Sequence, residues 1–244
     1  MFFGRPIRKW GEAAAGLLYP PHCAACGCAL SRLGGGLCRD CRRACPKIEG
    51  ACCLVCGQPY SGALSTDFRC RNCGDQDWAF AFATAAYRSR GVVRHLIHQF
   101  KYGGHLHLRH LLARMLSEGF RDRRVQEMRL DGIVPVPLHP TRRREREFNQ
   151  ADVLAQLAGA RLGLPVLDCL RRKRYTQTQT HFHRAERIKN LSGAFSLTGH
   201  PEVEGQRLAL VDDVLTTGST ADACASVLRQ AGVAVVVVIT VSRG

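Results

Sequence analysis

The sequence predicts an α/β domain with a parallel sheet flanked by helices, preceded by a small cysteine-rich unit that binds metal. Two apolar runs, 208–211 and 233–241, are continuous rather than alternating, as is typical of parallel strands buried on both faces. A helical stripe of Cys224, Val227, Leu228 and Ala231 lies between them. Of the 13 cysteines, 11 lie between Cys23 and Cys73. Strand, helix and strand in this order form the repeating unit of a parallel sheet.

Length and charge narrow the classes of protein. A chain of 244 residues with 45% hydrophobic content can bury one ordinary core and a smaller one. Its 35 Lys and Arg outnumber 20 Asp and Glu, for a net charge of +15, which favours an anionic partner such as nucleic acid, pyrophosphate or lipid headgroups. The longest apolar run is about half the length that crosses a bilayer, so we expect no transmembrane helix.

Residues 1–21 form a separate N-terminal segment. Basic residues precede an apolar stretch at 13–19, which imitates a signal peptide, but Glu12 and Gly16 interrupt the pattern. We interpret the segment as an amphipathic helix or tail that stops at Pro20. It would pack on the main domain or, alternatively, contact a membrane surface.

The cysteine-rich stretch 22–75 has the spacing of a double zinc ribbon. Eight cysteines form four C-x-x-C pairs, and two such pairs complete a tetrahedral zinc site with no open position, which is a structural site. The predicted ligands are Cys23, Cys26, Cys38 and Cys41 in one site and Cys53, Cys56, Cys70 and Cys73 in the other. A disulfide framework and iron–sulfur ligation are the alternatives.

Three cysteines in this unit are surplus to the two sites. We expect Cys28, Cys45 and Cys52 to be small buried residues, with exchange between Cys45 or Cys52 and a neighbouring ligand as the alternative. The unit has few aliphatic residues, so bound metal must supply much of its stability.

The chain then enters the predicted α/β domain, 76–244. A strand at 79–87 precedes one helix with the stripe Val93, Leu96, Ile97 and Phe100 and a second helix with apolar positions at 108–115. Five histidines between His95 and His110 have no nearby carboxylate or cysteine, so we interpret them as a solvated basic face rather than a metal site.

A basic loop follows the next predicted strand, 131–136. It carries Arg142, Arg143, Arg144 and Arg146 at the carboxyl end of that strand, where open parallel sheets bind ligands. Residues 142–189 hold 12 Lys and Arg against 5 Asp and Glu. This concentration of positive charge suits a pyrophosphate or a nucleic-acid phosphate.

The loop after strand 208–211 is the candidate ligand site. Thr216, Thr217, Gly218, Ser219 and Thr220 offer hydroxyls, backbone N–H groups and a helix N-terminus capped by Ser219 or Thr220, which together suit a phosphate. Asp212 and Asp213 would repel that phosphate, so we expect them to accept hydrogen bonds from neighbouring hydroxyls or to meet Mg²⁺. A sugar phosphate satisfies both requirements.

Residues 211–220 resemble the PRPP loop of type I phosphoribosyltransferases, where PRPP is phosphoribosyl pyrophosphate. The resemblance implies a phosphoribosyltransferase-like sheet, an acidic pair on the ribose hydroxyls, a following turn around the 5′-phosphate, and Mg with PRPP if the protein is active. It also implies that the basic loop meets pyrophosphate and that the polar stretch 171–184 is a catalytic hood. From the residues alone, a mobile lid and a plain solvated hairpin both fit that stretch.

The order of motifs is similar to that of the ComF family. It comprises the double zinc ribbon, Lys101-Tyr-Gly103, Val134-Pro-Val-Pro-Leu138, Arg146-Glu-Phe-Asn-Gln150, Thr178-Gln179, Arg187-x-x-Asn190 and the PRPP-like loop. The resemblance implies a cytoplasmic competence protein at the inner face of the membrane that assists single-stranded DNA uptake with a helicase-like partner. One residue departs from the family pattern, because Glu147 replaces a glycine beside the expected pyrophosphate.

Three functions remain open at this point. One is a phosphoribosyltransferase whose acceptor is unknown, and another is a PRPP sensor without turnover. The third is a module that binds single-stranded DNA through its basic loops, with Phe148, Tyr175 and Phe182 as stacking platforms or, alternatively, as minor core residues.

Overall fold

The computed structural model describes residues 21–30, 36–60, 62, 68–74, 76–175, 191, 193–199 and 202–244. Except for Pro21, the predicted N-terminal segment lies outside these residues, as do the motif positions Thr178, Gln179, Arg187 and Asn190. The helices of the described part include none that is both long enough and apolar enough to span a bilayer.

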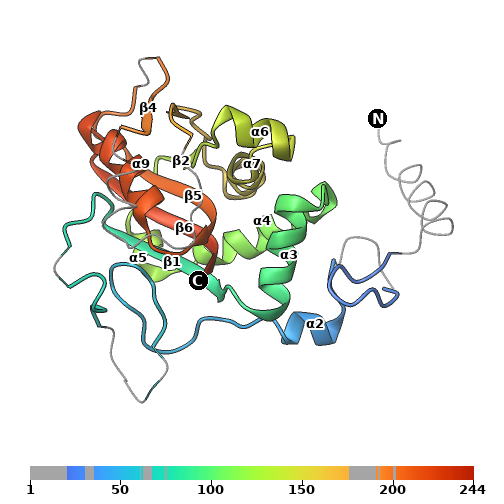
Figure 1. The fold of residues 1–244 in the computed structure, drawn as a ribbon. Helices are drawn as coiled ribbons and strands as arrows, with labels where there is room; N and C mark the ends of the chain where they lie inside the picture. The colour runs from blue at the N-terminus through green and yellow to red at the C-terminus, as the bar shows by residue number, and fades with distance from the viewer. Residues whose placement is uncertain are drawn as a thin grey trace, which may run out of the picture.

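A four-stranded sheet forms the centre of the main domain (Figure 1). Its strands, in spatial order, are β1 (Phe82–Arg88), β6 (Val235–Arg243), β5 (Arg207–Leu215) and β2 (Gly132–Pro135). Every pairing is parallel, with Ala209 opposite both Val237 and Ile133. Beyond β2, Ile133 makes a further parallel bridge to Val166, which extends that edge. The parallel sheet predicted from the continuous apolar runs is confirmed.

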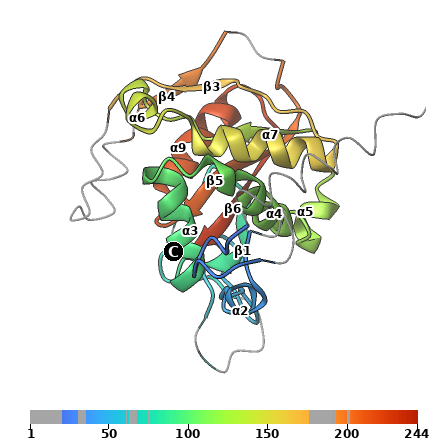
Figure 2. The same ribbon diagram turned by 90° about the vertical axis from the view of Figure 1, so that its right-hand side faces the viewer.

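Helices cover both faces of this sheet (Figure 2). One face carries α3 (Gly91–Tyr102), the 3₁₀ turn η1 (Leu106–Leu108), α4 (Arg109–Gly119) and α7 (Gln150–Leu162), with the short α5 (Arg123–Glu127) next to α4. The other face carries α9 (Ser219–Gln230), which packs on β5 and β6. The predicted stripe on α3 is confirmed, because Val93, Leu96, Ile97 and Phe100 are its buried residues.

Two turns differ from their predicted boundaries. The N-cap of α9 is Gly218 rather than Ser219 or Thr220, because Gly218 takes a φ of +84° and turns the chain one residue earlier. Residues 141–150 are not a plain loop, because Pro140–Arg146 form helix α6. Pro140 starts α6 with a favourable φ, and the His139 ring accepts a hydrogen bond from the Thr141 N–H.

The polar stretch after residue 170 begins as a strand pair. β3 (Leu170–Arg172) lies antiparallel to β4 (Phe195–Leu197), with Arg171 opposite Ser196. The remaining residues of the predicted hood, 176–184, fall outside the described part of the chain, so the choice between a lid and a hairpin stays a prediction.

The cysteine-rich unit packs along the outer edge of β1. The Ile48 N–H donates to the Ala86 carbonyl and the Ala83 N–H to the Val55 carbonyl, so β1 exchanges backbone hydrogen bonds with this unit as well as with β6. Within the unit, a five-residue helix, α2 (Arg39–Arg43), starts at Cys38. The edge strand of the sheet is therefore covered rather than exposed.

Candidate phosphate site and metal centres

The second group of cysteines forms a compact, buried cluster. The Sγ atoms of Cys53, Cys56, Cys70 and Cys73 lie within 4.8 Å of one another, and those of Cys56 and Cys70 are 3.7 Å apart. A tetrahedron with Zn–S bonds of about 2.3 Å has edges of about 3.8 Å. Burial raises the pKa of Cys53, but backbone N–H donors from Cys56, Cys70 and Val55 outweigh it and lower that pKa to about 7. The donor set and its spacing fit a zinc site.

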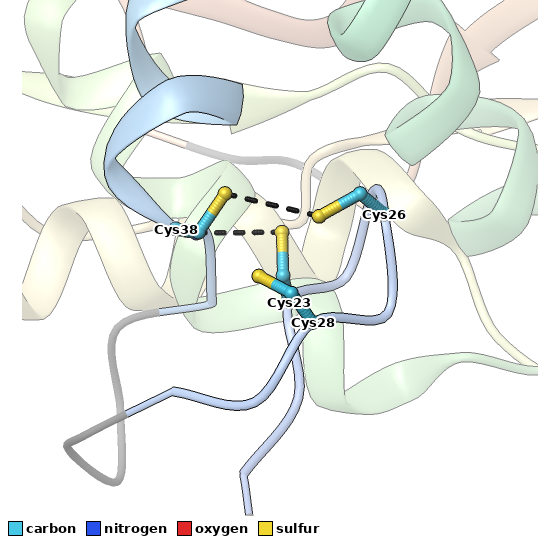
Figure 3. Close-up of side chains that lie close together, drawn as sticks. All are labelled: Cys23, Cys26, Cys28 and Cys38. Atoms are coloured by element: carbon cyan, nitrogen blue, oxygen red, sulfur yellow. Dashed lines mark hydrogen bonds between the residues drawn. The ribbon is translucent and has the colours of Figure 1, made fainter.

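The first group of cysteines has one thiol more than a tetrahedral site needs. Figure 3 shows Cys23, Cys26, Cys28 and Cys38 converging, with the Sγ atoms of Cys26 and Cys38 3.8 Å apart. The Cys41 thiol also interacts with the sulfurs of Cys23, Cys26 and Cys38. This spacing likewise fits zinc, and the thiols of Cys28 and Cys41 are both candidates for the fourth ligand beside Cys23, Cys26 and Cys38.

Two of the three surplus cysteines depart from the expectation of burial. Cys28 is exposed and faces the first cluster, because the Cys23 N–H donates to its carbonyl and folds the turn back on itself. Cys52 is half-buried, whereas Cys45 is buried as expected. His95, His98, His107 and His110 are exposed and His105 is half-buried, as expected of a solvated histidine face.

The predicted phosphate loop follows β5 and leads into α9. Gly218 is buried, and a Cβ there would lie 3.0 Å from the Trp78 ring, so the close packing and the positive φ both require glycine. The Thr217 and Ser219 hydroxyls are 3.1 Å apart. Asp222, in the first turn of α9, accepts a hydrogen bond from the Ala79 N–H. Residues 78 and 79, which follow the second cysteine cluster, thus contact the loop and the first turn of α9.

The two carboxylates lie within β5 rather than after it. Asp213 is buried, and its Oδ1 is 2.7 Å from the Nζ of Lys101, at the C-terminal end of α3. Burial and the charge of Asp213 raise the pKa of Asp212 to about 7, although Lys101 opposes the shift. Burial lowers the pKa of Lys101, but the charges of Asp213 and Asp212 outweigh this and raise it. The pair of carboxylates shares one ammonium group.

Of the four predicted arginines, Arg146 lies beside this acidic pair. The charge of Arg146 partly opposes the rise in the pKa of Asp212. Its guanidinium group also stacks over the Tyr102 ring at 4.8 Å and donates to the Tyr102 hydroxyl. Arg142 lies four residues earlier, on the same side of α6, 5.8 Å from the Tyr175 ring. Arg143 and Arg144 are exposed between these two positions. The periodicity of helix α6 therefore divides the four arginines into two half-buried and two exposed residues. A loop, as predicted for residues 141–150, would not divide them in this way.

Glu147 adopts a backbone conformation that favours glycine. Its φ is +66°, in the left-handed region, where it forms the C-cap of α6. A side chain there costs about 1 kcal/mol relative to glycine. Directly after it, Phe148 packs against Phe100 at 5.1 Å, so the interpretation of Phe148 as a minor core residue holds. Tyr175 is 46% exposed beside His139, and Phe182 lies outside the described residues.

Sequence reasoning gave no role to three residues that the fold brings to this site. They are Lys101, Tyr102 and Gln150, whose Oε1 accepts from Arg146. Lys101 and Tyr102 belong to the motif Lys101-Tyr-Gly103, which marks these residues but not their role, and the structure shows that they approach Asp213 and Arg146. A buried lysine paired with a carboxylate has no signature in local sequence.

Comparisons with known proteins agree with both parts of the chain. A family model described as "Double zinc ribbon domain" matches residues 14–76. The chain is 32% identical to competence protein F of Haemophilus influenzae over 221 residues, covering 87% of this chain and 92% of that protein. It is 33% identical to the DNA utilization protein YhgH of Escherichia coli over 225 residues, covering 90% and 96%. For ComFC of Bacillus subtilis the identity is 27%, covering 80% and 79%.

Solved structures with partial similarity include phosphoribosyltransferases. The B. subtilis glutamine PRPP amidotransferase has a TM-score of 0.37 and 23% identity, covering 58% of this chain and 30% of that one. Orotate phosphoribosyltransferase from Aeropyrum pernix has a TM-score of 0.33 and 17% identity, covering 55% and 70%. Overlap at this level assigns no chemistry.

Proposed function

Because the chain belongs to the family of competence protein F and the DNA utilization protein YhgH, we propose that it is a DNA-uptake or DNA-utilisation factor whose α/β domain binds PRPP or a related sugar phosphate. One observation carries the proposal. The loop 216–220, the carboxylates of Asp212 and Asp213, and the guanidinium group of Arg146 lie near one another at one end of the sheet, and Arg142 lies one helical turn from Arg146 on α6. Groups that suit a phosphate, a pair of hydroxyls and a pyrophosphate are thus available to one ligand.

Each part of the ligand has a distinct counterpart. The N–H groups at the start of α9 and the Thr217 and Ser219 hydroxyls suit a terminal phosphate. Asp212 and Asp213 suit sugar hydroxyls, which donate hydrogen bonds to carboxylates. Mg²⁺ would be held chiefly by the phosphates of the ligand. Lys101 neutralises Asp213 while no ligand is bound.

If the protein also turns PRPP over, its residues act through position and charge. Arg142 and Arg146 would stabilise a departing pyrophosphate, and the carboxylates would stabilise positive charge on the sugar. Pyrophosphate release that requires an added base would show transfer to that base, whereas release without one would show hydrolysis.

The test is calorimetric titration of the zinc-loaded protein with PRPP and Mg²⁺. Asp212→Asn with Asp213→Asn should abolish binding, whereas Arg143→Gln with Arg144→Gln, on the exposed side of α6, should leave it nearly unchanged at moderate salt. Equal binding by the wild-type protein and the double aspartate variant, with circular dichroism showing both folded, would overturn the sugar-phosphate assignment.

The pH dependence of binding gives an independent check. The pKa of Asp212 is raised to about 7, so this carboxylate is progressively protonated as pH falls below 7 and loses its capacity to accept from two hydroxyls. PRPP affinity should fall by up to about tenfold per pH unit below 7. In Asp212→Asn the residual dependence should be flatter, and an identical pH profile in both proteins would remove Asp212 from the site.

Glu147 offers a substitution that should improve the site. Glu147→Gly removes a carboxylate beside the arginine helix and relieves the left-handed φ, so it should raise PRPP affinity and stability by about 1 kcal/mol. Weaker PRPP binding by this variant would show that Glu147 contacts the ligand favourably, for example through Mg²⁺.

The exposed arginines of α6 favour a second binding activity, toward single-stranded DNA. Arg143 and Arg144 face solvent on α6, and the exposed Tyr175 ring lies 5.8 Å from Arg142 of the same helix. Neutralising these two arginines should weaken DNA binding and lower its salt dependence, because phosphate contacts release counterions. DNA affinity that does not decline with added salt would contradict this activity.

A further inference from the structure

Arg243, near the end of β6, connects the second cysteine cluster to the loop after β5. Only 7% of this residue is exposed. Its Nε donates to the Cys56 carbonyl at 2.9 Å, and its Nη2 lies 3.5 Å from the Cys56 sulfur. Its Nη1 donates to the Leu215 carbonyl at 3.0 Å and the Thr216 carbonyl at 2.6 Å. One guanidinium group therefore holds both a predicted zinc ligand and the first residue of the phosphate loop.

The charge balance of this contact depends on the metal. Nη1 of Arg243 also donates to an oxygen of Gly244. Burying a guanidinium group whose acceptors are mainly carbonyl oxygens is costly. Zinc bound by four thiolates carries a net charge of about −2, and hydrogen bonds to the thiolate sulfurs stabilise such sites. With metal bound, Arg243 lies beside its counter-charge. Without metal, this counter-charge is lost and the buried position of Arg243 becomes unfavourable. The carbonyls of Leu215 and Thr216 then lose their donor.

A second route joins the same two places. The chain that leaves Cys73 places Trp78 beneath Gly218 and hydrogen-bonds the Ala79 N–H to Asp222. On its other side the cluster packs directly on β1, since a Cβ on Gly57 would lie 2.8 Å from the Ala83 carbonyl oxygen. The second cluster and the loop are thus neighbours through both side-chain and main-chain contacts.

We propose that Arg243 is a positioning residue that couples metal occupancy of the second cysteine cluster to the conformation of the loop 215–220. The inference rests on the proposed function only in calling that loop a phosphate site. With metal bound, the guanidinium fork fixes the Leu215 and Thr216 carbonyls and thereby directs the following N–H groups toward the ligand. Loss of metal at the first cluster leaves the loop unaffected.

Hydrogen exchange of the full-length protein, read by mass spectrometry on peptides covering 212–220, tests the coupling through a double-mutant cycle. Cys70→Ser, which weakens the second metal site, should raise exchange in this loop about tenfold. Arg243→Met should raise it by a similar factor, and the combined variant should exchange little faster than either alone. Independent, multiplying effects, or no change in Cys70→Ser, would overturn the proposal.

Three controls separate positioning from general destabilisation. Cys38→Ser, at the first cluster, should leave loop exchange unchanged, and peptides from β2 should stay protected in every variant. Arg243→Met should also release zinc to a chromogenic chelator faster than the wild-type protein. Arg243→Lys keeps the charge but lacks the fork, so it should release zinc slowly, like the wild type, while its loop exchanges fast, as in Arg243→Met. If Arg243→Met does not fold, the same exchange measurement on wild-type protein before and after chelation decides the question.

The proposed function is tested separately by PRPP titration of the wild-type protein. Failure to bind PRPP would remove the sugar-phosphate assignment, whereas the exchange cycle would still report whether Arg243 couples the cluster to the loop. If PRPP does bind, its affinity should fall in Cys70→Ser and Arg243→Met but not in Cys38→Ser.

Discussion

The two cysteine clusters share one sequence pattern and differ in almost every structural respect. In the second, Cys53, Cys56 and Cys73 are buried, and the cluster has four thiols for four metal bonds. In the first, Cys26 and Cys28 are exposed, and a fifth thiol lies beside the group. Spacing of the C-x-x-C pairs sets where a metal can bind, whereas the surrounding fold sets how much of the structure depends on that metal.

Their neighbours explain the difference. The second cluster packs with Phe80 and Ala83 on the α9 face of the sheet and contacts Arg243. The first cluster reaches the core on the opposite face through Cys23 and Leu37, and Gly36 lies against the Leu111 side chain of α4. The second cluster is thus joined to β1, β6 and the loop by polar and apolar contacts, while the first rests on a helix surface.

The largest contrast should come from removing one ligand of each cluster. Cys73→Ser deletes a fully buried thiol and should cost about 4 kcal/mol or more, because metal binding and core packing are lost together. Cys26→Ser, at an exposed position, should unfold the first ribbon locally and leave the sheet intact. Thermal unfolding by circular dichroism should show a drop in Tm of about 10 °C or more for the first variant.

The contrast would collapse if both substitutions lowered Tm equally. Zinc content of each purified variant serves as the control, since a variant that keeps two zinc ions per chain has not removed the intended site.

A matched pair of glycines isolates the packing part of this contrast. Gly27 and Gly57 each follow the second cysteine of a knuckle, with φ of +72° and +64°. An added Cβ at Gly27 meets nothing within 4 Å, whereas at Gly57 it lies 2.8 Å from the Ala83 carbonyl oxygen. Gly27→Ala should therefore cost about 1 kcal/mol from backbone strain alone. Gly57→Ala should cost about 3 kcal/mol, because β1 must also move.

Urea unfolding of the two variants, followed by tryptophan fluorescence, measures the difference. Equal costs would mean that the second cluster yields as easily as the first, and that its contact with β1 does not stabilise the domain.

Local sequence patterns predict the strands and helices of this fold better than they predict the contacts between distant parts of the chain. The apolar runs around Leu210 and Val238 identified two central strands, because continuous burial leaves a pattern in neighbouring residues. The C-x-x-C pairs predict both cysteine clusters, because their spacing is also a local pattern. Arg243 carries no such pattern, since its partners Cys56 and Leu215 are 187 and 28 residues away.

The four arginines of the basic segment differ in exposure, which their sequence does not predict. We expect all four arginines between 142 and 146 to meet one ligand, whereas α6 leaves Arg142 and Arg146 half-buried, with Arg146 near Asp212, and exposes Arg143 and Arg144. Four exposed or half-buried arginines around one glutamate have no apolar periodicity, so the short helix that sorts them left no signal. His139 and Pro140, which start α6, were the available signs.

The smallest expected effect concerns the fifth thiol of the first cluster. Spacing predicts Cys41 as the fourth ligand, whereas the Sγ atoms within 4.8 Å of one another belong to Cys23, Cys26, Cys28 and Cys38. With both thiols in reach, Cys28→Ser and Cys41→Ser should each retain two zinc ions per chain, and the double variant should retain one. Cys45→Ser, outside the cluster, is the control. Loss of one zinc ion in Cys41→Ser alone would show that Cys28 is no ligand, and loss in Cys28→Ser alone would exclude Cys41. Retention in both single variants would mean that the first cluster tolerates a lost thiol, which the second, with four thiols, cannot do.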